Sequence, residues 1–172
     1  MPSRFDFSFH ARVAILTVLA LLMPTSSAQD QNVLKLTTDH SVYTIGKRIV
    51  VRARVGQNGF LYLFNIRADG LIDLLVPNRF ADGDSRSWAG ETRRFPNKDS
   101  GWWFVAPEPS GKHHLIAFLA PNGLKLDGLA RFDAGNPFAV VKARGQVALE
   151  QALKPRIPNG AIRADLEYVV KP

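Results

Sequence analysis

A pair of adjacent histidines is the first candidate for chemistry in this sequence. His113 and His114 are adjacent, and neighbouring residues of a β-strand point to opposite faces of the sheet. The pair therefore cannot chelate one metal ion unless the strand carries a bulge. A site made of His40, one member of the pair and a carboxylate is the metal-binding alternative. We predict ordinary strand histidines instead.

The polar loop at residues 78–90 carries the second candidate. Asp82 and Asp84 flank a glycine, and their carboxylate oxygens suit a hard cation such as calcium. The loop lacks the further acidic ligands and the closing glutamate of a 12-residue EF-hand loop. Asp82 and Asp84 remain candidate metal ligands, while the pattern favours a solvated turn with no metal and no cofactor.

Nucleophilic catalysis has little support in the residue types. The chain has no cysteine and four histidines, and it has no Gly-x-Ser-x-Gly elbow that would expose a serine nucleophile. We therefore assign no catalytic residue and predict a protein that is not an enzyme. The alternative is a small cation-dependent or carbohydrate-acting enzyme that uses the 78–90 loop.

Aromatic and arginine side chains indicate binding rather than catalysis. On a short strand Trp102 and Phe104 share the inward face, so Trp103 points outward. Exposed tryptophans beside arginines suit a protein interface or a sugar-stacking platform. The alternative is that all three tryptophans pack in the core. The predicted binding residues are Trp88, Trp103, Arg86, Arg93 and Arg94.

The stretch from residue 47 to residue 78 must position these groups. Residues 49–55 alternate between apolar and polar types, which is typical of a half-buried strand. Asn58 and Gly59 then favour a type I′ hairpin turn. Residues 60–66 are apolar on both faces, so Leu63 and Phe64 should lie on opposite, buried faces of a central strand. Asp69 and Gly70 turn the chain into a third strand at residues 71–76.

The other elements complete an all-β pattern. Several short strands bounded by turns, with one helix, predict an antiparallel two-layer β-sandwich, immunoglobulin-like or transthyretin-like, with one short C-terminal helix. Residues 138–141 fit either a strand or the start of a helix. The further strands are predicted at 33–38, 91–95, 101–105, 112–120 and 164–170, and the helix at 146–154, where Pro155 ends it.

The N-terminal residues predict export. Arg4 and Arg12 precede an apolar run at 13–23, and small residues follow up to Ala28, the order of a secretory signal peptide. We predict a signal at 1–28, cleavage near Ala28, and one domain at 29–172. The run is shorter than the about 20 residues of a transmembrane helix, so no stable membrane span should remain. Export without cysteine fits a periplasmic or secreted bacterial protein.

Charge narrows the class of partner. The chain carries a formal net charge of +7, which favours acidic partners. The predicted partners are an envelope protein or an anionic glycan. Nucleic acid is not predicted, because an exported protein seldom meets it and the basic residues form no dense cluster in the sequence.

Residues 34–121 contain an ordered series of short motifs: Tyr43, Gly46, Gly59-Phe60-Leu61-Tyr62, Asp69-Gly70, Val76-Pro77-Asn78, Gly90-Glu91, Phe95-Pro96, Pro109-Ser110-Gly111 and Leu115-Ile116-Ala117. This series resembles the bacterial domain-of-unknown-function family 4384. The resemblance implies an extracytoplasmic β-rich module, a kind sometimes attached to kinase-like or caspase-like proteins or associated with secretion machinery. The family has no established catalytic residues, and residues 122–172 form an extension outside it.

Together these features predict an exported, non-enzymatic binding or assembly module of the bacterial envelope, with a possible link to secretion machinery. Besides the enzyme, a second alternative is a periplasmic inhibitor that inserts a loop into the cleft of an enzyme.

Overall fold

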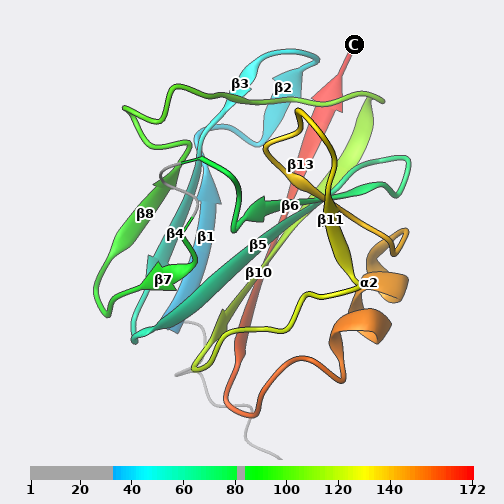
Figure 1. Cartoon of the computed structure of the whole chain (residues 1–172). Helices are drawn as coiled ribbons and strands as arrows, with labels where there is room; N and C mark the ends of the chain where they lie inside the picture. The colour runs from blue at the N-terminus through cyan, green and yellow to red at the C-terminus, as the bar shows by residue number, and fades with distance from the viewer. Residues whose placement is uncertain (1–32, 81–83) are drawn as a thin grey trace, which may run out of the picture.

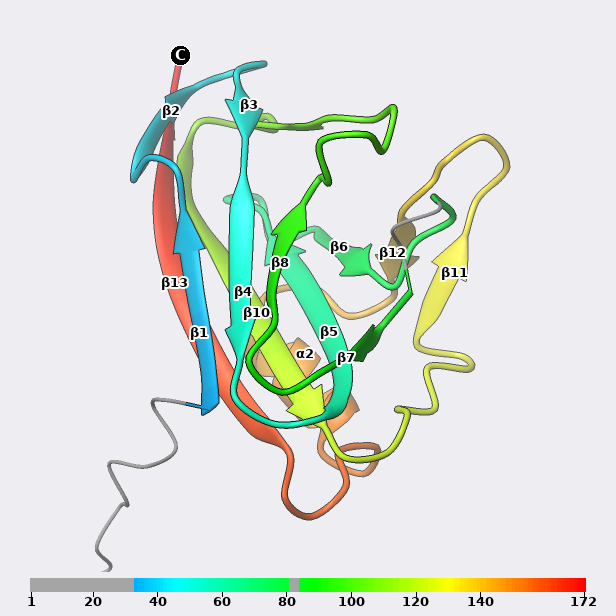
Figure 2. The same ribbon diagram turned by 90° about the vertical axis from the view of Figure 1, so that its left-hand side faces the viewer.

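A computed structural model describes residues 33–80 and 84–172, in which strands dominate and one short helix is present. A three-stranded sheet, called the front sheet here, faces the viewer in Figure 2. Its strands are β1 (Leu34–Thr38), β4 (Val51–Val55) and β8 (Thr92–Phe95), in the antiparallel order β1-β4-β8. The predicted signal peptide and its cleavage site lie outside the described residues.

A larger sheet, called the back sheet, lies behind the front sheet in Figure 2 and to its right in Figure 1. Its strands follow the order β11-β12-β6-β5-β10-β13-β2, and β7 pairs with β5. All of these pairs are antiparallel except β13 with β2, which is parallel. The bounds are β2 Val42–Thr44, β5 Gly59–Ile66, β6 Ile72–Val76, β7 Arg86–Ser87, β10 Gly111–Ala120, β11 Ala130–Phe132, β12 Ala139–Val141 and β13 Ile162–Lys171.

Two hydrophobic cores lie on the two faces of the back sheet. Leu63 of β5 belongs to the core between the sheets, together with Val51 and Phe95 from the front sheet. Phe64 belongs to the second core, on the far face, where it packs with Leu149 and Leu153 of helix α2 (Gln146–Leu153). Leu63 and Phe64 are both fully buried, so the prediction of opposite, buried faces is confirmed.

The predicted fold class is confirmed: the chain forms an all-β, sandwich-like arrangement with one short helix near its C-terminal end. Helix α2 ends at Leu153, just before the proline predicted to stop it. Residues 139–141 form strand β12, which decides between the two predictions for that segment. Among the described residues, no helix combines the length and the apolar character that crossing a membrane requires.

The predicted hairpin at Asn58 and Gly59 is wrong. β4 pairs with β1 and β8, whereas β5 pairs with β6, β7 and β10, so the chain passes from the front sheet to the back sheet at this point. Gly59 does not adopt a positive φ angle. It is small for another reason, because a Cβ there would lie 2.8 Å from the carbonyl oxygen of Ala120. The next turn is as predicted: Gly70 has φ 83° and joins β5 to its antiparallel neighbour β6.

The strands predicted at residues 91–95 and 101–105 have separate partners. The two segments do not pair with each other: β8 lies along β4, while β9 (Phe104–Val105) pairs with β3 (Arg48–Ile49). Both therefore line up against the continuous stretch from Arg48 to Val55. This arrangement fixes where the tryptophans lie.

A pocket beside Trp103

The two adjacent tryptophans point in opposite directions, as the alternation predicts. Trp102 is 5% exposed and stacks on Phe80, with 5.2 Å between ring centroids and 11° between planes. It also meets Phe138 edge to face. Trp103 is 49% exposed, and the guanidinium carbon of Arg48 lies 3.3 Å from its ring centroid. The alternative, that all three tryptophans pack in the core, is thereby excluded.

A pocket of about 180 Å³ opens next to Trp103. Val105, exposed on the same face of the chain as Trp103, forms part of its wall, and Phe138 contributes an aromatic side. The pocket is thus mostly apolar, with a charged pair at one side. Its full lining is Arg67, Asp73, Leu75, Trp103, Phe104, Val105, Pro107, Asn136 and Phe138.

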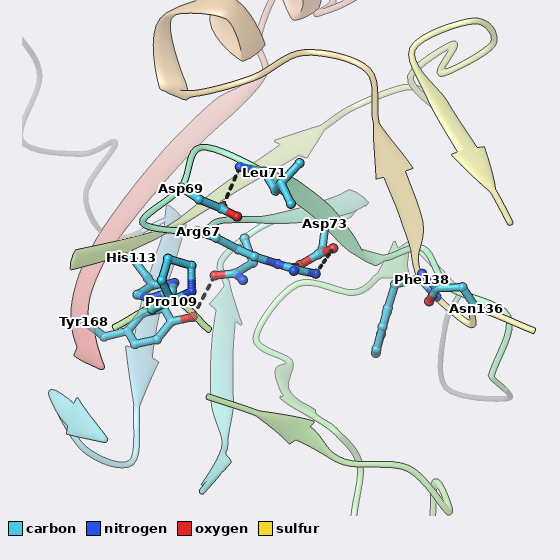
Figure 3. A network of polar contacts seen from close by, with 10 residues as sticks. Arg67, Asp69, Leu71, Asp73, Pro109, His113, Asn136, Phe138 and Tyr168 are labelled. Atoms are coloured by element: carbon cyan, nitrogen blue, oxygen red, sulfur yellow. Dashed lines mark hydrogen bonds and ion pairs between the residues drawn. The ribbon is translucent and has the colours of Figure 1, made fainter. Parts of the chain in front are cut away.

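The charged pair is a bidentate contact between Arg67 and Asp73 (Figure 3). Arg67 donates from Nε to Asp73 Oδ2 and from Nη2 to Asp73 Oδ1, each at 2.8 Å. The hydrogen bonds to Asp73 raise the pKa of Arg67 above its ordinary value, so the guanidinium stays protonated. Planar, bidentate pairs of this kind are rigid. The pair gives the pocket a fixed polar wall.

A buried polar cluster continues from this wall into the space between the sheets (Figure 3). The Tyr168 hydroxyl donates to Asn65 Oδ1 at 2.8 Å, and the His113 ring stacks on the Tyr168 ring at 5.2 Å. Burial raises the pKa of Tyr168, which keeps the hydroxyl protonated as a donor. The cluster holds the end of β13 against β10 and β5.

His113 is a fully buried residue of strand β10. Its Nε2 lies 3.0 Å from the carbonyl oxygen of Pro109, and a carbonyl can only accept, so Nε2 carries the proton. His113 Nδ1 and Asn65 Nδ2 are buried and have no hydrogen-bond partner within the described part of the chain. Burial lowers the pKa of His113. His114, the next residue, faces the other way and lies 3.8 Å from Glu167.

Acid is expected to destabilise the fold through His113. Because burial lowers its pKa in the folded state, the unfolded chain binds a proton first as the pH falls through about 6.5. Folding stability should therefore fall as the pH drops below about 6.5, and level off once the folded protein is protonated too. Urea denaturation between pH 8 and 5 measures this, with His114→Gln as the exposed control. A His113→Gln variant that keeps the same pH dependence would contradict it.

The other predicted binding residues do not join Trp103. Trp88 is 57% exposed and follows β7, near the Val55 end of β4, whereas Trp103 lies near Arg48 at the opposite end of the same stretch (Figure 2). Seven residues of extended chain separate the two ends by roughly 20 Å. Trp88 has its own neighbour, Arg86, whose guanidinium carbon lies 6.0 Å from its ring centroid. The predicted binding residues therefore form two separate surfaces, one at Trp88 and one at Trp103.

Arg93 and Arg94 lie on opposite faces of β8. Arg93 points inward: its side chain is 11% exposed, donates to Ser87 Oγ at 3.2 Å, and lies against the ring of Phe95. Arg94 lies on the outer face and donates to the carbonyl oxygen of Pro96. Arg93 therefore supports the junction of β7 and β8, while Arg94 is on the solvent side.

The candidate cation loop is described in part. Asp82 lies outside the described residues. Asp84 accepts a hydrogen bond from the backbone N–H of Arg86 at 3.0 Å, the local contact of an Asx-turn. Across residues 33–80 and 84–172, no three His, Asp or Glu side chains are grouped so as to hold a metal ion.

Sequence reasoning missed the residues around Trp103. Arg48 meets the ring through the pairing of β3 with β9, a contact between distant segments. Arg67 and Asp73 flank the turn at Gly70, so the hairpin register could have placed them on one face. Asn136 and Phe138 come from beyond the predicted family segment, and no local pattern brings them to this pocket.

The fold and the pocket define a class: an all-β sandwich-like domain with an aromatic pocket at one end. Residues 42–122 match the family model described as Domain of unknown function (DUF4384), so the predicted resemblance is confirmed for that segment. No curated protein and no solved structure matches the chain.

Proposed function

We propose that this protein is an exported, non-enzymatic binding or assembly module of the bacterial envelope, and that it engages an envelope protein at Trp103. The observation that carries the proposal is the half-exposed ring of Trp103, held under the Arg48 guanidinium at the rim of a pocket. Tryptophan and arginine are the residues in which binding energy most often concentrates.

The geometry around Trp103 supports a protein partner in particular. Its partner-facing surface combines an aromatic ring, the apolar side chain of Val105 and the paired charges of Arg67 and Asp73. Such an apolar centre with a polar rim is the usual anatomy of a protein interface. A side chain of the partner would fill the pocket. At the edge of the pocket, Arg67 would donate hydrogen bonds to the partner and Asp73 would accept them.

Trp103→Ala is expected to weaken capture of the envelope partner by about 30-fold, which corresponds to the about 2 kcal/mol of a hot spot. Trp88→Ala is the matched control, because it removes an equally exposed tryptophan from the other end of the stretch. Both variants should stay folded. The measurement is affinity capture from an envelope fraction, followed by titration of the purified partner.

Two results would contradict the proposal. One is a Trp103→Ala variant that binds as tightly as the parent, and the other is an equal loss in both variants. Export is checked in the same preparation: the mass of the periplasmic protein should correspond to a chain beginning at Gln29. A mass that includes Met1 would remove the export part of the proposal.

A further inference from the structure

The outer face of the front sheet is strongly basic. Residues alternate along β4, so Val51, Ala53 and Val55 point into the core while the two arginines between them point to solvent. The neighbouring strands add one cation each. The cationic face consists of Lys35, Arg52, Arg54 and Arg94, flanked by Thr37 and Thr92. It is the face of β1, β4 and β8 turned toward the viewer in Figure 2.

These cations are paired with one another across the strands. Lys35 lies directly opposite Arg54, and Arg52 lies directly opposite Arg94. Like charges in directly opposite positions destabilise a sheet. The two pairs share β4, so the four charges form a zigzag over three strands. The opposed cations therefore lower the stability of the folded protein.

No carboxylate of the front sheet neutralises this charge. β1, β4 and β8 contain neither aspartate nor glutamate. The two described acids next to these strands interact elsewhere. Asp39 Oδ1 accepts from the Val50 N–H, while Glu91 Oε2 accepts from the Trp88 N–H and Glu91 Oε1 lies 4.0 Å from Arg93 Nε. The acids of β13, Asp165 and Glu167, alternate with the inward-facing Leu166 and Tyr168, so they lie on the far face of the back sheet.

We propose that the cationic face binds a linear anionic polysaccharide. Across residues 33–80 and 84–172, no acidic side chain forms an ion pair with these four cations. A row of such charges with no apolar side chain between them offers a polymer charge neutralisation and release of its counterions. The face lacks the aromatic or aliphatic anchors on which protein interfaces depend. It also lacks the apolar residues that would insert into a lipid surface. The hydroxyls of Thr37 and Thr92 lie at the ends of the two rows, where they can bond sugar hydroxyls.

The shape of the edge supports an extended ligand. A hollow of about 340 Å³ runs along the edge strand β8. Thr92, Arg93 and Arg94 contribute to its wall, and Glu91 is the one acidic residue of its lining. The chain of a polysaccharide can lie along this edge while its acidic groups meet the arginines of β4. The inference rests on the proposed exported location, where such polymers occur, but it uses a surface distinct from Trp103.

Binding of polygalacturonate, measured by titration calorimetry at several salt concentrations, tests the inference. The double variant Arg52→Gln/Arg54→Gln should bind at least tenfold more weakly at low salt. Its plot of log K against log salt should be less steep by about 1.4, or about 0.7 for each cation removed. Lys35→Gln/Arg94→Gln, which removes the opposite member of each pair, should show the same change.

The matched control is Lys125→Gln/Lys142→Gln, which removes two exposed charges outside the front sheet. It should bind within about twofold of the parent, because the net charge alone does not make the site. Unfolding midpoints provide the second readout. Both front-sheet variants should unfold at or above the temperature of the parent, since each removes repulsion between opposed cations.

Three results would overturn the inference. They are no binding by the parent at low salt, an equal loss in the control variant, and tighter binding to duplex DNA or to phosphatidylglycerol vesicles than to polygalacturonate. Trp103→Ala separates this test from that of the proposed function. This variant should bind the polysaccharide as tightly as the parent does. A failure of protein capture would therefore not contradict the polysaccharide site, and a failure of polysaccharide binding would not contradict the protein-binding role of Trp103.

Discussion

Phe64→Ala is expected to lower the free energy of unfolding by about 3–5 kcal/mol, and Leu63→Ala by about 2–5 kcal/mol. Both side chains are fully buried, but in different cores. Each truncation loses buried apolar surface and leaves a cavity that the surrounding sheet cannot fill. β5 lies in the middle of the back sheet, between β6 and β10, which limits its freedom to relax.

Urea denaturation of the two variants measures the effect. Val147→Ala is the control, because Val147 lies on α2 with most of its side chain exposed, and it should change stability by about 0.5 kcal/mol or less. A loss below about 1 kcal/mol for Leu63→Ala would mean that the space between the sheets is open to water. The same result for Phe64→Ala would mean that α2 does not cover the back sheet.

Trp102→Ala is expected to cost about 3–5 kcal/mol, whereas Trp103→Ala should cost about 1 kcal/mol or less. Trp102 stacks on Phe80 and contacts Phe138 edge to face. Its removal therefore leaves a cavity among the aromatic rings of the core between the sheets. Trp103 loses one cation–π contact, with Arg48. The same substitution at these two adjacent tryptophans should therefore lower the free energy of unfolding by amounts that differ by several kcal/mol.

Thermal and urea unfolding of both variants, with near-ultraviolet circular dichroism as the probe of aromatic packing, decide the matter. Trp103→Ala that fails to fold would make its ring a core residue and leave the proposed binding surface without its anchor. Trp102→Ala that remains as stable as the parent would show that the contacts of Phe80 and Phe138 contribute little.

The two proposed binding surfaces are built on the same stretch of chain. β9 and β8 line up against successive parts of one stretch, Arg48 to Val55. The first pairing creates the Trp103 pocket at one end, and the second completes the cationic face along the front sheet. One continuous stretch of chain, with β4 at the centre of the front sheet, therefore takes part in both surfaces.

The sequence by itself determined which way side chains point along each strand. Residues 51–55 and 102–105 alternate in the structure as their residue types predict, and Leu63 and Phe64 take opposite faces. The reason is local: successive side chains of a strand alternate whatever the strand pairs with. The helix at 146–153 and the turn at Gly70 were predictable for the same reason, because both depend on neighbouring residues.

Only the tertiary structure decided which strands became neighbours. Asn58 and Gly59 favour a hairpin, yet β4 finds its partners in β1 and β8, because burying two apolar faces of β5 requires strands from distant parts of the chain. The same nonlocal pairing separates Trp88 from Trp103, brings Arg48 over the Trp103 ring, and sets Arg94 opposite Arg52. Each of these contacts joins residues far apart in sequence, so no local pattern encodes it.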